Sequence, residues 1–208
     1  VACRVALLGV GTVGGGVAQL LVNEAAELKT RTGGLDITLV AAADLDAQRL
    51  APLAAQGVET TDDAHALIAR DDIDVVVELV GGTGIAKELV VEALRAGKAV
   101  VTANKALLAH AGTEIFAAAK EGSAHLGFSA SVCGGTPVLL ALRSGLVAND
   151  ISSVMGIVNG TCNYVLTRMT REGVDYADVL AEAQKNGYAE ADPALDVELE
   201  FAADLLDL

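Results

Sequence analysis

The sequence contains no tryptophan, and only 3% of its residues are aromatic. Residues of the hydrophobic class still make up 52% of the 208 positions, so the core must be built from alanine, valine, leucine and isoleucine. At about 150 residues per domain, a chain of this length holds one large domain or one domain and part of another. The composition favours tightly packed layers of helices and strands.

Basic residues are scarce: 14 lysines and arginines stand against 28 acidic residues, which gives a formal net charge of -14. Binding to nucleic-acid phosphates needs clustered lysine and arginine, and the sequence contains no such cluster. We therefore predict that the protein has no nucleic-acid partner. An acidic, self-repelling surface is typical of a soluble cytoplasmic protein.

Cysteine is also rare, and the three present, Cys3, Cys133 and Cys162, form no C-x-x-C pair. Their odd number and wide spacing favour reduced thiols over a disulfide framework or a zinc site, which indicates a reducing compartment. No apolar stretch reaches about 18 residues without a charge or a turn signal, and Val1 begins a strand-like run rather than a basic leader. The sequence therefore predicts neither secretion nor insertion into a membrane.

Short β-branched runs alternate with alanine- and leucine-rich segments of helical spacing. Because this pattern is typical of parallel strands joined by crossover helices, we predict an α/β fold with a doubly wound, mostly parallel sheet. Strands are expected at residues 4–8, 37–43, 74–80 and 99–102, and helices at residues 12–29, 63–70, 85–95 and 105–121. Gly97 and Gly122 stand where left-handed caps would end the last two helices, and Thr61, Asp62 and Asp63 offer cap oxygens for the second.

The segment Gly9-Val10-Gly11-Thr12-Val13-Gly14 matches the fingerprint G-x-G-x-x-G, directly after the first expected strand and at the start of the first expected helix. Gly9 would allow the tight turn, Gly11 the approach of a pyrophosphate, and Gly14 the close packing of helix on sheet. Thr12 and Val13 would offer N–H groups at the positive end of the helix dipole. Such a turn can be purely structural, but its place in a βαβ series favours a dinucleotide site on a Rossmann-type domain.

Asp44 closes the second expected strand, where Rossmann-type domains carry the acid that binds the cofactor ribose. It lies further from Gly14 than the usual spacing of about 20 residues, because a long helix and a loop intervene. A carboxylate there would accept a hydrogen bond from the ribose 2′-hydroxyl and repel a 2′-phosphate, which favours NAD over NADP. Arg49 lies near enough to weaken this preference, and the alternative is that Asp44 only ends the strand.

Glycines and polar residues also follow the next two expected strands, at Gly81, Thr102 and Lys105. Ligands of open α/β sheets bind at these carboxyl ends, so we assign all three residues to the cofactor site. Lys105 is the most informative, because a cation at the start of a helix opposes the helix dipole and costs stability unless it serves a ligand. The alternative is a solvated surface lysine.

From about residue 129 the pattern changes. A glycine-rich turn at residues 131–137 precedes a strand-like run at 151–158, a second turn at Asn159-Gly160, and helices expected at 161–171 and 176–186. We place the domain boundary between about residues 125 and 150. The chain is accordingly divided into residues 1–130, the dinucleotide-binding domain, and residues 131–208, a second domain.

Six segments together resemble the homoserine dehydrogenase family, and they occur in family order across nearly the whole chain. They are GVGTVGGG from Gly9, ELVGG from Glu78, VTANKALLA from Val101, ASVCGGTP from Ala130, GIVNGTCNYVLT from Gly156 and NGYAEADP from Asn186, which is followed by Asp196-Val197. The last two are much more specific than a glycine-rich loop. The resemblance implies reversible, NAD(P)-dependent interconversion of L-aspartate 4-semialdehyde and L-homoserine by hydride transfer, a step toward threonine, methionine and isoleucine.

The resemblance also implies roles for individual residues. Lys105 would be the catalytic residue, which contacts the cofactor or substrate and assists proton transfer. Gly187 would lie against the cofactor, and Glu190 would hold the amino group of the substrate. Further substrate positions implied by the matching segments are Asp196, Gly160 and Thr161.

Members of the family also bind a monovalent cation such as sodium through backbone carbonyls, which here would belong to Val132, Gly134 and Thr136. Where the family usually has a glutamate at this site, the chain has Ser129, and an uncharged hydroxyl is a weaker ligand for a hard cation. The family pairs through an α+β substrate and dimerisation domain, so a homodimer is expected.

Two departures lie near the end of the sequence. Phe201 and Leu205 stand where the family carries an aspartate and a lysine beside the reacting atoms, and leucine cannot donate a proton. The chain also stops where the family continues, so we expect the second domain to be incomplete. Two other interpretations stay open: a catalytically impaired or non-catalytic NAD(P)-binding relative, and another semialdehyde or amino-acid dehydrogenase on the same fold, which residues 186–193 fit poorly.

Overall fold

The computed structural model describes residues 2–157 and 159–186. The described residues up to Ala141 form one compact unit, and those from Leu142 onward form a second. Within these ranges, every helix is too short or too polar to span a bilayer.

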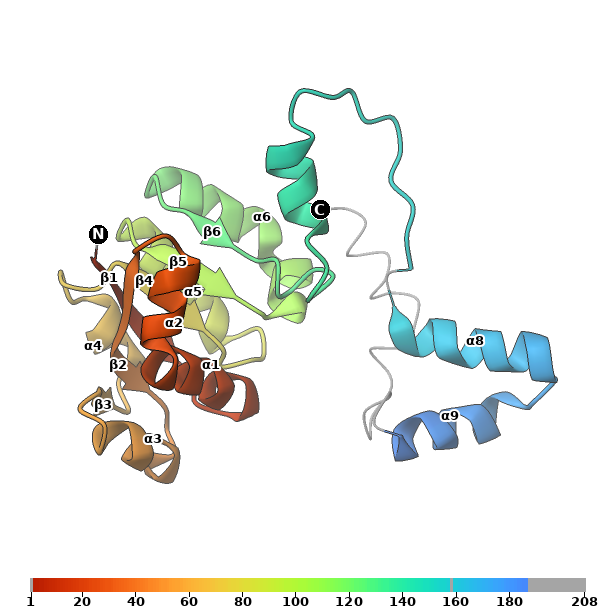
Figure 1. Cartoon of the computed structure of the whole chain (residues 1–208), viewed down its shortest axis with the longest axis horizontal. Coiled ribbons are helices and arrows are strands. Elements are labelled where there is room, and N and C mark those ends of the chain that lie inside the picture. Colours follow the sequence, from red (N-terminus) through yellow and green to blue (C-terminus); the bar gives the residue numbers. More distant parts are fainter. Residues whose placement is uncertain (1, 158, 187–208) are drawn as a thin grey trace. The chain divides into compact units, whose positions relative to one another are not determined.

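A parallel sheet is the centre of the first unit. Its strands in the described residues are β1 (Ala2–Leu8), β2 (Asp36–Ala43), β3 (Glu59–Thr61), β4 (Val75–Glu78), β5 (Ala99–Thr102) and β6 (Leu126–Gly127). Every neighbouring pair is parallel, and the order across the sheet is β3-β2-β1-β4-β5-β6 (Figure 1). The chain adds β2 and β3 on one side of β1 and then crosses over to add β4, β5 and β6 on the other side. This change of side at β1 is the topology of the doubly wound Rossmann fold. The predicted fold class is confirmed.

Helices cover both faces of this sheet. They are α1 (Thr12–Asn23), α2 (Ala25–Arg31), α3 (Ala47–Ala54), α4 (Ala64–Ile68), α5 (Ile85–Arg95) and α6 (Lys105–Glu121). In β1, Ala6 and Leu8 pack into a core shared with α4, α5 and α6, whereas Val5 and Leu7 pack into a core shared with α1 and α3. Successive side chains of a strand point to opposite faces, so the burial of all four requires helices on both faces.

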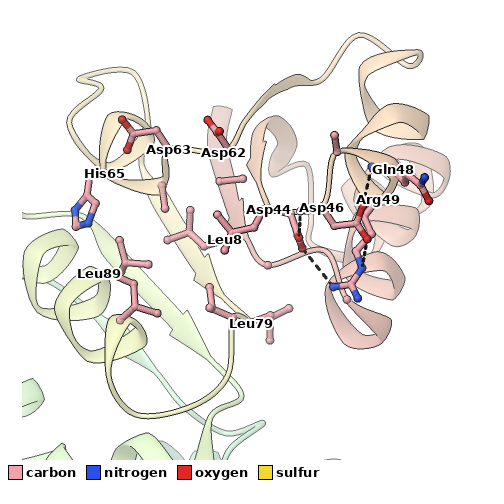
Figure 2. Close-up of a pocket in the computed structure, with 18 residues that line it drawn as sticks. Leu8, Asp44, Asp46, Gln48, Arg49, Asp62, Asp63, His65, Leu79 and Leu89 are labelled. Atoms are coloured by element: carbon pink, nitrogen blue, oxygen red, sulfur yellow. Dashed lines mark hydrogen bonds and ion pairs between the residues drawn. The ribbon is translucent and has the colours of Figure 1, made fainter.

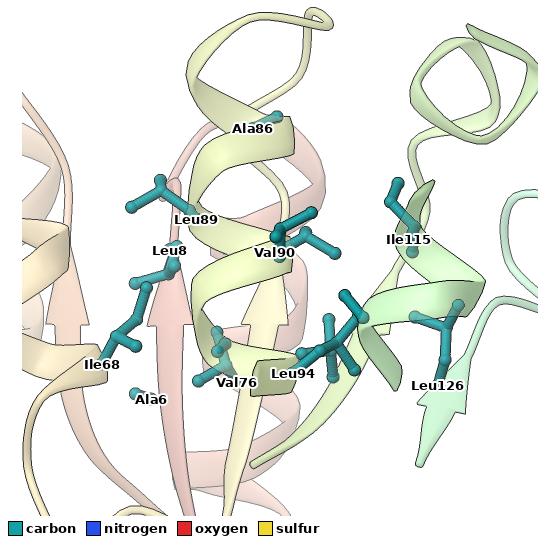
Figure 3. Close-up of a cluster of buried hydrophobic side chains, with 14 of the residues drawn as sticks. Ala6, Leu8, Ile68, Val76, Ala86, Leu89, Val90, Leu94, Ile115 and Leu126 are labelled. Atoms are coloured by element: carbon teal, nitrogen blue, oxygen red, sulfur yellow. The ribbon is translucent and has the colours of Figure 1, made fainter. Parts of the chain in front are cut away.

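The larger core lies between the sheet and α5. Figure 3 shows Leu89, Val90 and Leu94 of α5 over Leu8 of β1 and Val76 of β4. All five side chains are at most 2% exposed. This packing explains why the valine- and leucine-rich runs at residues 74–80 and 85–95 were recognisable in the sequence as a strand and a helix.

Several element boundaries differ from the prediction. The helix expected at residues 12–29 is interrupted, because Glu24 leaves the helical conformation with φ -112° and ψ 18°. The part after it, α2, has no buried side chain, so no core packing holds it in line with α1. α3, β3 and β6 were not predicted. A capping signal for α3 was nevertheless present, since Asp46 accepts a hydrogen bond from the Gln48 N–H.

The two expected glycine caps have different outcomes. Gly97 takes the left-handed conformation, with φ +78°. The same prediction for Gly122 is wrong, because Gly122 has φ -80° and the next residue, Ser123, is left-handed instead. Gly122 serves close packing: a Cβ there would lie 1.8 Å from the carbonyl oxygen of Leu94 in α5.

Beyond β6 the chain forms the short helix α7 (Val138–Leu140), a π-helical turn at Ala141–Gly145, and then α8 (Gly160–Glu172) and α9 (Tyr176–Lys185). α8 and α9 pack against each other, and Glu182 of α9 accepts hydrogen bonds from Tyr164 and Arg168 of α8, each at 2.9 Å. The strand predicted at residues 151–158 is wrong for residues 151–157, and residue 158 lies outside the described residues. A strand needs a neighbour to pair with, and the described part of the second unit contains none.

Candidate functional site

The turn between β1 and α1 is built on two glycines that tolerate no side chain. Gly9 has φ +88°, and a Cβ there would lie 2.5 Å from the carbonyl oxygen of Leu79. A Cβ on Gly14 would lie 2.0 Å from the carbonyl oxygen of Gly9. The Gly9 N–H also donates to the Ala43 carbonyl at the end of β2, at 2.8 Å. The turn is therefore held tightly against itself and against the ends of β2 and β4.

Gly11 meets a different requirement. It is the N-cap of α1, and a Cβ there would meet only Nη1 of Arg49, at 3.7 Å, so this position borders open space. No side chain caps the first turn of α1, that turn contains no acidic residue, and Thr12 and Val13 are exposed. N–H groups at a helix N-terminus without side-chain partners bind anions. The start of α1 therefore fits the pyrophosphate of a dinucleotide.

Asp44 at the end of β2 holds the glycine turn in place. Its Oδ2 accepts the Val10 N–H at 2.6 Å, its Oδ1 accepts the Asp46 N–H at 2.9 Å, and its side chain is only 10% exposed. Burial by itself raises the pKa of the Asp44 carboxyl, but the two backbone hydrogen bonds and the charge of Arg49 outweigh it, so the pKa lies below its ordinary value. Asp44 is therefore ionised at neutral pH.

A cleft of about 1060 Å³ lies at the carboxyl ends of β1, β2 and β4, and Gly9 and Gly11 are part of its lining. This volume is slightly above the usual range for small-molecule sites, about 300–1,000 Å³. Figure 2 shows how the labelled side chains surround it: on one side Asp44, Asp46 and Arg49, on the other Asp63 and His65, and between them Leu8 and Leu79. The cleft lies where doubly wound sheets bind their ligands.

The polar lining of the cleft is mainly acidic. It contains four carboxylates, those of Asp44, Asp46, Asp62 and Asp63, and the guanidinium of Arg49. Arg49 is already paired, since its Nη1 lies 3.8 Å from Asp44 Oδ2 and its Nε lies 3.3 Å from Asp46 Oδ2. The balance of charge in this part of the cleft is therefore negative.

A second cluster of polar groups joins the ends of β4 and β5. Glu78 is fully buried, and its Oε1 accepts the N–H groups of Val80 at 2.9 Å and Gly81 at 3.2 Å. Its Oε2 accepts the hydroxyl of Thr102 at 2.6 Å. Thr102 is the register partner of Glu78 in the neighbouring strand and is also fully buried. The predicted cofactor residues Gly81 and Thr102 are thus linked by the same carboxylate.

Asn104 connects this cluster to Lys105, the first residue of α6. The Asn104 side chain caps the helix by accepting the Leu107 N–H at 3.0 Å, and its amide nitrogen donates to the Gly82 carbonyl at 2.7 Å. The backbone N–H of Asn104 donates to the Thr102 hydroxyl oxygen at 3.0 Å. The exposed Lys105 therefore stands on a helix start that is fixed to both the end of β5 and the loop after β4.

The carbonyls of the predicted cation site lie in the turn after β6. Val132, Gly134 and Thr136 belong to this turn, in which the Thr136 N–H donates to the Cys133 carbonyl and the Thr136 carbonyl accepts the Val138 N–H, both at 2.8 Å. One of the three predicted ligands therefore already has a hydrogen-bond partner. In the described part of the chain, no group of three or more His, Cys, Asp or Glu side chains is placed to hold a metal ion.

The predicted substrate residues fall into two groups. Gly160 and Thr161 begin α8 in the second unit, where the Asn159 side chain caps the helix by accepting the Cys162 N–H at 2.8 Å. The other predicted positions lie outside the described residues; they are Gly187, Glu190 and Asp196, together with the departures at Phe201 and Leu205.

Glu78 and Asn104 were not predicted as site residues, although each has a recognisable signal in the sequence. Glu78 ends an otherwise all-valine strand at residues 75–77, and a carboxylate in so apolar a setting must find hydrogen-bond donors. Asn104 directly precedes an expected helix, and asparagine is a preferred N-cap residue.

Known proteins match the chain over most of its length. Residues 9–129 match the family described as "Homoserine dehydrogenase, NAD binding domain", and residues 137–204 match the family described as "Homoserine dehydrogenase". A homoserine dehydrogenase of Neisseria gonorrhoeae is 50% identical over 198 residues, which are 94% of this chain and 44% of that relative.

Solved structures agree with these matches. A homoserine dehydrogenase from Thiobacillus denitrificans superimposes with a TM-score of 0.85 at 46% identity, covering 98% of this chain and 47% of that one. A hyperthermophilic archaeal homoserine dehydrogenase in complex with NADPH superimposes with a TM-score of 0.77 at 25% identity, covering 98% of this chain and 67% of that one. The chain thus spans a little under half the length of the Neisseria and Thiobacillus relatives.

Proposed function

The chain belongs to the homoserine dehydrogenase family, and we propose that it carries the cofactor site and part of the substrate site of an NAD(P)-dependent homoserine dehydrogenase. The observation that carries the proposal is the cleft at the topological switch point of the sheet, whose lining includes Gly9, Gly11 and Asp44. The start of α1 fits a pyrophosphate, and the ionised Asp44 fits a ribose hydroxyl. The proposed reaction interconverts L-aspartate 4-semialdehyde and L-homoserine.

The chemistry needs a hydride and a proton. Bound NAD(P)H would supply the hydride, and the protein must orient the substrate and provide for the proton on its carbonyl oxygen. We assign this proton to Lys105, because it stands at the carboxyl end of β5 on the capped start of α6. Binding of substrate is assigned to Gly160, Thr161, Glu190 and Asp196, and a further cofactor contact to Gly187.

We propose further that the chain prefers NAD to NADP. The acidic side chains of the cleft would repel a 2′-phosphate, whereas the Asp44 carboxylate would accept a hydrogen bond from a 2′-hydroxyl. Arg49, the cation of the cleft that opposes this preference, is engaged by Asp44 and Asp46. The archaeal relative whose structure contains NADPH is only 25% identical to this chain, so its cofactor does not fix the preference here.

Three other assignments remain part of the proposal. A monovalent cation would be held by the carbonyls of Val132, Gly134 and Thr136, although Ser129 adds no charge to the site. The protein would act as a cytoplasmic homodimer on its small-molecule substrate. These assignments are supported by the family resemblance and, for the cytoplasm, by the acidic composition and by the odd number and wide spacing of the cysteines in the sequence.

A catalytically impaired, NAD(P)-binding relative is the second candidate. It is favoured by Ser129, Phe201 and Leu205, which replace charged residues of the family pattern with uncharged ones. Under this alternative the cleft would still bind the dinucleotide, but the proton of the reaction would lack a donor other than Lys105.

One experiment separates the two candidates. The chain is titrated with NADH and with NADPH by calorimetry, and turnover is followed by the loss of reduced-cofactor absorbance when L-aspartate 4-semialdehyde is added. Binding together with turnover supports the dehydrogenase. Binding without turnover supports the second candidate, and the absence of binding to both nucleotides would reject the cofactor site itself.

A further inference from the structure

The hydrogen bonds between the ends of β4 and β5 have a fixed direction. The Thr102 hydroxyl has a single proton, which it donates to Glu78 Oε2 at 2.6 Å, and its oxygen accepts the Asn104 N–H at 3.0 Å. Both oxygens of Glu78 act as acceptors, Oε1 for two backbone N–H groups and Oε2 for the Thr102 hydroxyl. The Thr102 proton thus points to Glu78, and a lone pair of the hydroxyl oxygen is left for Asn104.

The other oxygen of Glu78 shapes the loop after β4. It accepts the N–H groups of Val80 and Gly81, and these residues precede Gly82 in a loop where both glycines have positive φ, +80° and +69°. The Asn104 side chain donates to the Gly82 carbonyl at 2.7 Å. The loop and the start of α6 are thus joined in two ways: directly by this bond, and through Glu78 and the Thr102 hydroxyl.

Glu78 is in a setting where a carboxylate is costly. It is 0% exposed, and its neighbours Val76 in β4 and Val100 in β5 are equally buried and apolar. Burial of so polar a side chain is tolerated only when hydrogen bonds satisfy it, and the three donors to Glu78 supply that compensation. A valine would continue the strand without this cost, so the carboxylate must be explained by what its hydrogen bonds hold in place.

We propose that Glu78 is a positioning residue of the active site. It fixes the loop of residues 80–82 beside the cofactor cleft and, through Thr102 and Asn104, it fixes the first turn of α6, which carries Lys105. Glu78 acts through these groups and touches neither substrate nor cofactor. The catalytic consequence rests on the proposed function, whereas the structural consequence can be measured without turnover.

The first test measures amide hydrogen exchange of Val80, Gly81 and Asn104 by nuclear magnetic resonance on the full chain. In Glu78→Gln the side-chain amide can keep its oxygen on Val80 and Gly81 only by turning its NH₂ group toward the Thr102 hydroxyl. The Thr102 proton then loses its acceptor on Glu78 and must turn elsewhere, so the hydroxyl is held less firmly and the Asn104 amide bonded to it should exchange about tenfold faster or more. Glu88→Gln, the same change on the exposed surface of α5, should leave all three rates unaltered.

Substitutions of Thr102 supply an independent arm that does not alter the carboxylate. Thr102→Ser keeps the hydroxyl and should preserve slow exchange of the Asn104 amide. Thr102→Val removes the hydroxyl, so it should accelerate exchange of the Asn104 amide and change the exchange rates of the Val80 and Gly81 amides less. If Glu78→Gln fails to fold, this pair decides. The proposal is overturned if Asn104 exchanges at the wild-type rate in Glu78→Gln, or if Thr102→Ser behaves like Thr102→Val.

The second test measures turnover. If Glu78 positions Lys105, Glu78→Gln should lower kcat by about tenfold or more with a smaller change in KM, and Thr102→Val should lower kcat several-fold more than Thr102→Ser does. Altered exchange with unchanged kcat would overturn the role in positioning the site. Absence of turnover in the wild-type chain would count against the proposed function instead, and the exchange rates would then decide the fate of the positioning proposal.

Discussion

The carboxylate of Asp44 accepts the N–H of Val10 at 2.6 Å, and this bond ties the end of β2 to the glycine turn that follows β1. The same side chain lines the cleft in which we place the dinucleotide. One residue therefore has two measurable roles, in the stability of the turn and in the choice of cofactor, and each leads to its own prediction.

Replacing Asp44 with asparagine should shift cofactor preference toward NADP. The substitution removes one of the negative charges that would repel a 2′-phosphate, so the ratio of the Kd for NADPH to the Kd for NADH should fall by about tenfold, or about 1.4 kcal/mol. Calorimetric titration of both nucleotides measures this ratio. Asp71→Asn changes an exposed aspartate outside the cleft and should leave the ratio unaltered. An unaltered ratio in Asp44→Asn as well would remove Asp44 from cofactor recognition.

Asp44 should also contribute to the pH dependence of stability. Its pKa is lower in the folded state than in the unfolded chain, so its contribution is present above the unfolded pKa of about 3.9 and is lost as the pH falls through the folded pKa. The free energy of unfolding of Asp44→Asn should therefore lie below that of the wild type near neutral pH, and the difference should shrink below about pH 4. Urea unfolding of both proteins across this range measures it. A difference that stays constant with pH would contradict the lowered pKa.

The parts of the fold that the sequence predicted well are those whose burial is visible in the chain itself. β1 and β2 are buried on both faces toward their carboxyl ends, and β4 and β5 are short valine-rich runs with one face buried, so all four read as apolar runs. α5 and α6 show helical spacing with clear ends. β3 and β6 are three and two residues long, too short for any alternation to be recognised. Residues 151–157 show the reverse case, because a β-branched pattern predicts a strand but pairing depends on a neighbour that the pattern cannot reveal.

The candidate site was predictable to the extent that it depends on local sequence. The glycine turn and Asp44 follow from the positions of their residues relative to strands, and the structure places Gly9, Gly11 and Asp44 in the lining of one cleft. Contacts between distant segments could not be read in this way. One donor to Glu78, the Thr102 hydroxyl, comes from the neighbouring strand β5. Residue 122 must be glycine because the Leu94 carbonyl of α5 leaves no room for a Cβ, and its own dihedral angles do not require glycine.

Two glycines of α1 that are two positions apart should respond oppositely to alanine. A Cβ on Gly14 would lie 2.0 Å from the Gly9 carbonyl oxygen, so Gly14→Ala must displace the turn and should lower the free energy of unfolding by at least about 2 kcal/mol. Gly16 has no atom within 4 Å of the same position, so Gly16→Ala should raise it by about 0.5–1 kcal/mol through better helix propensity. Urea denaturation measures both. Equal effects of the two substitutions would show that the clash at Gly14 is relieved at no cost.

Lys105→Ala should separate catalysis from stability. Loss of the group that handles the proton should lower kcat by about 10²-fold or more. The free energy of unfolding should change by less than about 1 kcal/mol, since a cation at a helix N-terminus interacts unfavourably with the helix dipole. Lys120→Ala at the other end of α6 is the matched control, because there a cation is favourable to the dipole and no role in the site is assigned. Its turnover should equal that of the wild type. If Lys105→Ala keeps wild-type turnover, or loses turnover only in proportion to the fraction of protein unfolded, Lys105 has no part in proton transfer.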